Sequence, residues 1–210
     1  MMRSAIILPF LLLIAACNNG GPNTRAINIK VEGAGGVTAY FDRFQNGLPF
    51  HVDSVKLGGD GSGTMHIPAS PLDFYRIALG NEQLIVVLDS TDALNVEAMS
   101  GLLSTPIKAE GSKNTDLFRH FQEEAQGFDS KTAALRAALA SDPNNTANID
   151  ELNATNQAFY ERCKQFASEN SGSPAAIGAL GRLDIAQEFE LFKQVREGLR
   201  KSTPRSAFFN

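Results

Sequence analysis

Sulfur is the first chemistry to consider, because the chain has two cysteines, Cys17 and Cys163. They do not form a Cys-x-x-Cys pair, so the sequence lacks the dithiol centre of a disulfide oxidoreductase. Cys163 falls on the apolar stripe of an expected helix, between Phe159 and Phe166. A cysteine buried among apolar groups has a raised pKa and is unreactive. We therefore expect Cys163 to be a packing residue, with an intermolecular disulfide or a reactive thiol as the alternatives.

The histidines are the other candidate ligands or bases: His51, His66 and His120. His51 and Asp53 are one residue apart on an expected strand, so their side chains should point to the same side. Two ligands without a third are weak evidence for a metal site, and we expect a solvent-facing pair. We expect His66 and His120 on exposed faces of a strand and a helix. The sequence thus predicts no metal and no cofactor.

Motifs for nucleophilic or phosphate chemistry are incomplete. The glycine-rich segment 58–63 (Gly-Gly-Asp-Gly-Ser-Gly) has no lysine and precedes a short strand, whereas a phosphate-binding loop opens a helix. The same segment contains Gly61-Ser62-Gly63, but the glycines directly flank the serine, whereas the Gly-x-Ser-x-Gly nucleophile motif has one residue between the serine and each glycine. It is therefore predicted to be a hairpin turn. Glu188 and Glu190 are two apart on a helix and face different ways. We predict no catalytic residue and no enzyme activity.

The first 16 residues differ from the rest. Met1-Met2-Arg3 is short and positive, and the run from Ile6 to Ile14 is apolar apart from Pro9. A basic start, a short apolar run and small residues before a cut are typical of a secretory signal. The run is too short to span a hydrocarbon core of about 30 Å. Residues 1–16 are therefore predicted to be a signal peptide that is removed.

The end of this segment, Ile14-Ala15-Ala16-Cys17, resembles the bacterial lipobox, although Ile14 stands where that motif usually has leucine. The resemblance implies lipidation of Cys17, with an ordinary signal peptide as the alternative. Asn18 follows the cysteine, rather than aspartate, which implies the outer membrane, facing the periplasm. Two acyl chains suffice for stable anchoring, since each buried CH₂ contributes about 0.8 kcal/mol. Residues 17–25 are expected to form a flexible tether.

Composition limits what the folded part can be. The 210 residues are 43% hydrophobic and 20% charged, which excludes a disordered or fibrous chain. The net charge of −4 argues against a nucleic-acid-binding protein. The length is enough for about two small domains.

Residues 26–111 show the period of two that is typical of strands. Ile27, Ile29 and Val31 alternate with polar residues, and the apolar face of 50–57 switches near Ser54, which suggests a bulge. The run 84–88 is apolar on both faces and is expected to be a central strand. Strands are predicted at 27–31, 37–42, 50–57, 64–67, 74–79, 84–88, 94–98 and 107–109. They suggest a small antiparallel sandwich or barrel.

Residues 112–203 show a helical period, and 204–210 are expected to form a tail with an apolar ending, 207–210. Helical patterns lie on both sides of a break at 141–145, and Asn148 with Glu151 is interpreted as a capping box. Ser173-Pro174 is expected to start a last pair of helices, 175–183 and 185–199. The buried stripe of the final helix is predicted to be Ile185, Phe189, Phe192, Val195 and Leu199. The fold class is therefore α+β, with a small antiparallel β-sandwich or barrel followed by an α-helical domain.

Two stretches suggest a family: 107–118, from Ile107-Lys108-Ala109 to Leu117-Phe118, and 166–180, which contains Ser171-Gly172-Ser173-Pro174. With the lipobox and the strand-rich start, they resemble the uncharacterised N-terminal domain of the thioredoxin-like lipoproteins of Bacteroidetes of the TlpA/ResA type. In that family a thioredoxin domain with Trp-Cys-x-x-Cys usually follows. Nothing in this sequence matches that motif, so no catalytic residue carries over.

Three hypotheses follow. The first is a non-catalytic, lipid-anchored module of the cell envelope, a spacer or docking platform with a redox protein of the envelope as a candidate partner. The second is a periplasmic protein that binds a small ligand or peptide in the cleft between sheet and helices. The third is the accessory half of a split thiol-disulfide oxidoreductase.

Overall fold

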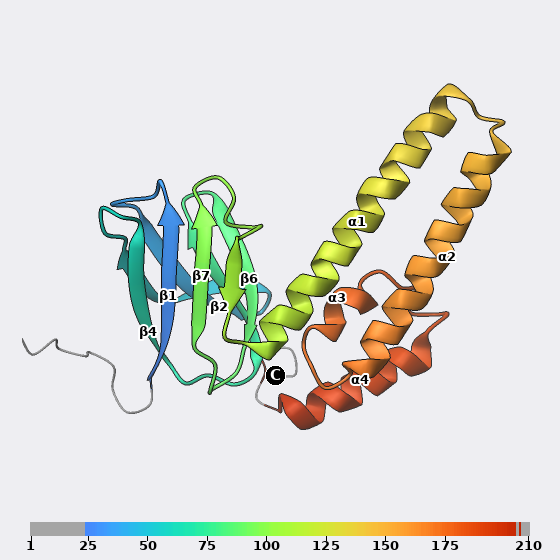
Figure 1. Ribbon diagram of the computed structural model, residues 1–210. Helices are drawn as coiled ribbons and strands as arrows, with labels where there is room; N and C mark the ends of the chain where they lie inside the picture. The colour runs from blue at the N-terminus through green and yellow to red at the C-terminus, as the bar shows by residue number, and fades with distance from the viewer. Residues whose placement is uncertain (1–23, 205, 207–210) are drawn as a thin grey trace, which may run out of the picture.

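The computed structural model describes residues 24–204 and 206, in which strands come first and helices second (Figure 1). This confirms the α+β class. The strands are β1 (Thr24–Glu32), β2 (Thr38–Gln45), β3 (Leu48–Lys56), β4 (Ser62–Pro68), β5 (Asp73–Leu79), β6 (Glu82–Leu88), β7 (Leu94–Met99) and β8 (Lys108–Glu110). The helices are α1 (Lys113–Ser141), α2 (Thr146–Glu169), α3 (Ala176–Leu180) and α4 (Phe189–Ser202). The predicted signal peptide, Cys17 and most of the tether and tail lie outside the described residues.

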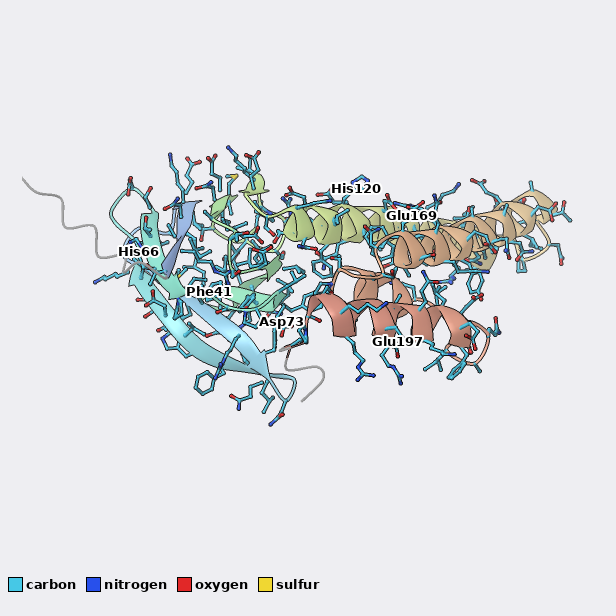
Figure 2. The ribbon with its side chains drawn as sticks, turned by 90° about the horizontal axis from the view of Figure 1, so that it is seen from below. Phe41, His66, Asp73, His120, Glu169 and Glu197 are labelled. Carbon is cyan, nitrogen blue, oxygen red and sulfur yellow. The ribbon has the colours of Figure 1, made fainter. Side chains whose placement is uncertain are left out.

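The strands form two four-stranded sheets that pack face to face as a sandwich. Sheet A has the order β4-β1-β7-β8 and sheet B the order β3-β2-β5-β6. One pair departs from the expected antiparallel arrangement, since β1 and β7 are parallel, with Ile27 opposite Leu94. The alternating apolar residues of each strand face sheet B. On β1 these are Ile27, Ile29 and Val31, as the predicted pattern requires. Phe41, which is fully buried, lies between the sheets (Figure 2).

The prediction that 84–88 is a central strand is wrong, because β6 lies at the edge of sheet B. It is apolar on both faces since one face meets sheet A and the other meets helices: Val86 belongs to the sandwich core and Val87 to the helical core. Side chains of α1 close its open edge. Thr115 Oγ1 accepts a hydrogen bond from Val87 N at 3.0 Å, and Ser112 Oγ and Thr115 Oγ1 both donate to Val87 O. The backbone N–H and C=O groups of Val87, on the open edge of β6, are thus hydrogen-bonded without a neighbouring strand.

The glycine-rich segment 58–63 is not the predicted hairpin turn. The segment connects β3 of sheet B to β4 of sheet A, so the chain crosses from one sheet to the other there. Gly61 has φ +78°, and a side chain there would overlap the carbonyl oxygen of Val31. Only glycine permits this close backbone approach.

The tether prediction ends two residues too late, because β1 begins at Thr24. Arg25 lies on the inward face of β1, is 6% exposed, and places its guanidinium 5.3 Å from the centre of the Tyr75 ring. Within residues 24–204 and 206, no hydrogen-bond acceptor meets the guanidinium nitrogens. Burial lowers the pKa of Arg25, while the phenol group of Tyr75 and the carboxylates of Asp92 and Asp89 act against that shift.

The long helices α1 and α2 form an antiparallel hairpin that projects from the sandwich (Figure 1). α1 runs through Gly127 without a break, and Ser112 caps its start by accepting from Thr115 N. The predicted break at 141–145 is confirmed, since α1 ends at Ser141 and α2 begins at Thr146, but the cap of α2 is Asn145, whose side chain accepts from Asn148 N. The predicted box of Asn148 with Glu151 is therefore placed three residues too late.

A second apolar core joins the helices to the sandwich. Phe118, Phe121 and Phe166 pack there with the alanines of α3, and sheet B contributes Phe74 and Val87. The rings of Phe74 and Phe118 meet edge to face, with centroids 5.2 Å apart. Asp73 marks the end of the sandwich that faces α4 (Figure 2). Since this junction is packed with aromatic side chains, the helical part has a fixed place against sheet B.

Candidate functional site

An apolar groove lies between α3 and α4, with a volume of about 620 Å³. We call it the α3–α4 groove. Ile177 and Leu180 come from α3, Ile185 from the connecting turn, and Phe189, Phe192, Val195 and Leu199 from α4; Lys193 and Arg196 complete the lining. The buried side chains of Val195 and Leu199 form its floor, since they also belong to the helical core.

Part of the predicted stripe of the final helix is exposed. Val195 and Leu199 are buried as expected, but Ile185 is 58% and Phe189 61% exposed. The predicted helix from 185 is interrupted, because Asp184 Oδ1 accepts from Ala186 N and Gln187 N and α4 begins only at Phe189. Ile185 and Phe189 therefore lie at the mouth of the groove rather than in the helical core.

A close backbone approach fixes α4 against the rest of the helical part. Gly198 lies so near the loop after α2 that a Cβ atom there would overlap the carbonyl oxygen of Ser171. Ser202 Oγ donates to Gly172 O at 2.5 Å, and Gln194 Nε2 donates to Ser168 Oγ at 3.2 Å. These contacts hold one wall of the groove in place.

The opposite end of the groove is held by a polar cluster. Tyr160 donates from its hydroxyl to Glu188 Oε1 at 2.6 Å, and Lys164 Nζ lies 3.1 Å from the same oxygen. The hydrogen bond to this carboxylate raises the pKa of Tyr160 to about 12, and the same contacts lower the pKa of Glu188. The cluster ties α2 to the residue that immediately precedes α4.

The charge of the groove differs from that of the whole chain. α4 carries four basic residues, Lys193, Arg196, Arg200 and Lys201, against two acidic ones, whereas the chain has a net charge of −4. Lys193 and Arg196 line the groove with more than half of each side chain exposed, and each has an acidic neighbour on α4: Lys193 lies 3.5 Å from Glu190 and Arg196 lies 3.0 Å from Glu197. The groove therefore combines an apolar floor with two basic lining residues that are paired with carboxylates of the same helix, while Arg200 and Lys201 give α4 its excess of basic residues.

Cys163 lies on α2 as a fully buried, free thiol in the helical core. Burial raises its pKa to about 11, while the nearby guanidinium groups of Arg182 and Arg162 act in the opposite direction. The predicted packing position is thus confirmed.

We expect Cys163 to react with a thiol reagent only when the helical part opens. A rise of its pKa from 9.0 to about 11 reduces the thiolate fraction at neutral pH by about 100-fold, and burial blocks access as well. Labelling with a disulfide reagent, followed by mass spectrometry, should show no modification of Cys163 in the native protein and full modification in denaturant. Stoichiometric labelling of the native protein within minutes would contradict the burial.

The structure separates the predicted pair of His51 and Asp53. Val52 is an extra residue in β3, so His51 lies opposite Asp42 and Asp53 lies opposite Phe41. Adjacent residues of β2 face opposite sides of the sheet, so His51 and Asp53 do as well, and the same-side prediction is wrong. Asp53 instead accepts from His66 N of sheet A at 3.2 Å. The predicted bulge exists, about two residues before Ser54.

The other histidines lie where the sequence predicts. His66 is half-buried on the side of β4 opposite the buried Met65 and Ile67. His120 is exposed on α1, where its Nε2 atom lies 3.1 Å from Glu124 Oε1. Figure 2 shows His120 on the outer side of that helix. Among residues 24–204 and 206, no group of three histidine, cysteine, aspartate or glutamate side chains gathers to hold a metal ion.

No family model matches the chain, and comparisons with curated proteins and with solved structures find no similar protein. In the described part of the chain, every helix is too short or too polar to cross a membrane.

Proposed function

We propose that this protein is a non-catalytic docking module of the bacterial cell envelope, anchored by a lipid at Cys17, which binds a partner protein in the α3–α4 groove. The observation that carries the docking role is the groove itself, with Ile185 and Phe189 exposed at its mouth. The lipobox and the resemblance to thioredoxin-like lipoproteins support the anchor and the location, at the outer membrane facing the periplasm.

The partner segment is an amphipathic helix with an apolar ridge and acidic flanks. The groove is concave and apolar, which suits a row of side chains at helical spacing. Lys193 and Arg196 are paired with Glu190 and Glu197 only at exposed side chains, so acidic flanks of a partner can replace those carboxylates, and complementary charge raises the rate and specificity of association. A flat membrane surface would not fill a concave groove in this way.

The groove favours this function over the two other hypotheses. At the junction between sheet and helices, Phe74, Val87 and Phe118 pack together, so the ligand cleft expected there has less support. A thiol role has less support because Cys163 is fully buried with a raised pKa.

The test is binding of a fluorescent amphipathic peptide to the purified full chain, followed by anisotropy. The probe is about 18 residues long, or five helical turns, with leucines on one face and glutamates beside them. The variants Ile185→Asp and Phe189→Asp should each weaken binding by at least about tenfold, or 1.4 kcal/mol. Both side chains are more than half exposed, so the fold should tolerate the changes.

The matched control is Ile107→Asp, because Ile107 is 71% exposed and lies before β8 on the sandwich. It should bind the peptide as the parent does. A peptide with lysine in place of glutamate should bind more weakly, and equal binding would contradict the charge argument. No binding of the acidic peptide, or a preference for anionic lipid vesicles that depends on Phe189, would overturn the docking proposal.

A further inference from the structure

A second concave surface lies on the outer face of sheet B, at the end away from the helices. β5 starts at the junction with Phe74 and ends at Leu79, and the surface surrounds the turn that follows, Gly80-Asn81. Its volume is about 320 Å³, which is near the lower end of the range for small-ligand sites, about 300–1,000 Å³. We call it the β-turn pocket.

The charged side chains in the β-turn pocket are already paired. Asp42 is 4% exposed, and one of its oxygens accepts from Arg76 Nε at 2.8 Å and lies 2.7 Å from Arg76 Nη2. His51 Nδ1 lies 3.5 Å from the other oxygen. Glu82 accepts from the backbone N–H groups of Gly101 and Leu103, both at 2.8 Å. An anion or a cation would therefore find no unpaired opposite charge among these groups.

The groups that remain available are neutral. Asn81 and Gln83 each present a carboxamide, which offers two donors and an acceptor. Tyr40 is 44% exposed, and its ring meets His51 edge to face at 5.6 Å. In the described ranges, no hydrogen bond engages the Tyr40 hydroxyl or the side chains of Asn81 and Gln83. An aromatic ring with a polar end, beside free amides, suits a ligand with both an apolar face and many hydroxyls.

We propose that the β-turn pocket binds a neutral saccharide. A pyranose ring presents C–H groups on its face, which can lie on Tyr40, and hydroxyls at its edge that both donate and accept, which match Asn81 and Gln83. The pair of buried Asp42 and half-buried Arg76 holds β2 and β5 in register beneath the sugar. The site is separate from the α3–α4 groove, so it does not depend on the docking function.

The test is an NMR titration of the ¹⁵N-labelled full chain with neutral disaccharides: cellobiose, maltose, lactose and chitobiose. At least one of them should shift the backbone amides of residues 80–83 and of Tyr40 in a saturable way. Tyr40→Ala should weaken this binding by about tenfold, or 1.4 kcal/mol, and Gln83→Ala should also weaken it. Both residues are exposed, so the amide spectrum should show an intact fold.

The matched control is Phe50→Ala, since Phe50 is a 50% exposed aromatic residue on β3 that does not line the pocket. It should leave saccharide binding unchanged. Glucuronate and glucosamine provide an anionic and a cationic sugar of similar size. Shifts with only one of these charged sugars, no shifts with any neutral disaccharide, or an unchanged affinity in Tyr40→Ala would overturn the proposal.

Discussion

The double variant Ser112→Ala/Thr115→Val is expected to lose about 3–6 kcal/mol of the free energy of unfolding. Thr115 Oγ1 is the acceptor for Val87 N, and the two hydroxyls are the donors to Val87 O. All three residues are buried, so water cannot replace these bonds without opening the junction. Ser112 also caps α1, and its loss adds about 0.5–2 kcal/mol. Urea unfolding followed by circular dichroism measures the change.

Thr132→Val is the matched control for this variant. Thr132 is also a buried threonine of α1, but its hydroxyl donates to Phe128 O within the helix. Its loss leaves no strand edge unpaired, so we expect a change below about 1 kcal/mol. A double variant within 1 kcal/mol of the parent would contradict the assignment of these hydroxyls as the closure of the β6 edge.

Phe121→Ala is expected to cost about 3–5 kcal/mol, the usual range for deletion of a buried aromatic ring. Phe121 is 2% exposed, and its ring centre lies 4.6 Å from that of Phe166 and 6.2 Å from that of Phe159. It also approaches Gly178, so it joins α1, α2 and α3. Hydrogen exchange should show faster exchange in the helices than in β1 and β7, because the sandwich core does not include this ring.

Phe189→Ala serves as the control, because Phe189 is 61% exposed and contributes little to the core. It should keep nearly the full stability while weakening binding of the acidic peptide. Equal losses of stability in the two phenylalanine variants would show that Phe121 is not the centre of the helical core.

The sequence allowed prediction of the elements wherever one period dominated. All eight strands exist near their predicted positions, and the order of strands before helices is confirmed. Their partners were harder to predict. The period of two cannot tell a central strand from an edge strand covered by a helix, which is why β6 was misplaced.

Site residues were harder to predict because they depend on local irregularities. Val52 adds a residue to β3 and moves His51 and Asp53 to opposite faces, which spacing alone does not show. Ile185 and Phe189 have the spacing of a buried stripe, but the turn capped by Asp184 interrupts the helix before α4. Aspartate before the apolar residues was the available signal, since it favours a helix start or a turn at that point.

The long first helix has a mechanical consequence. At a rise of about 1.5 Å per residue, the 29 residues of α1 extend about 43 Å from the edge of sheet B, and the helix begins at the hydroxyls that bind Val87. The hairpin of α1 and α2 is thus a long arm that is attached at the edge strand β6. A force on the far end of this arm would be transmitted to the sandwich as torque on β6, so β6 would be the first strand to be displaced.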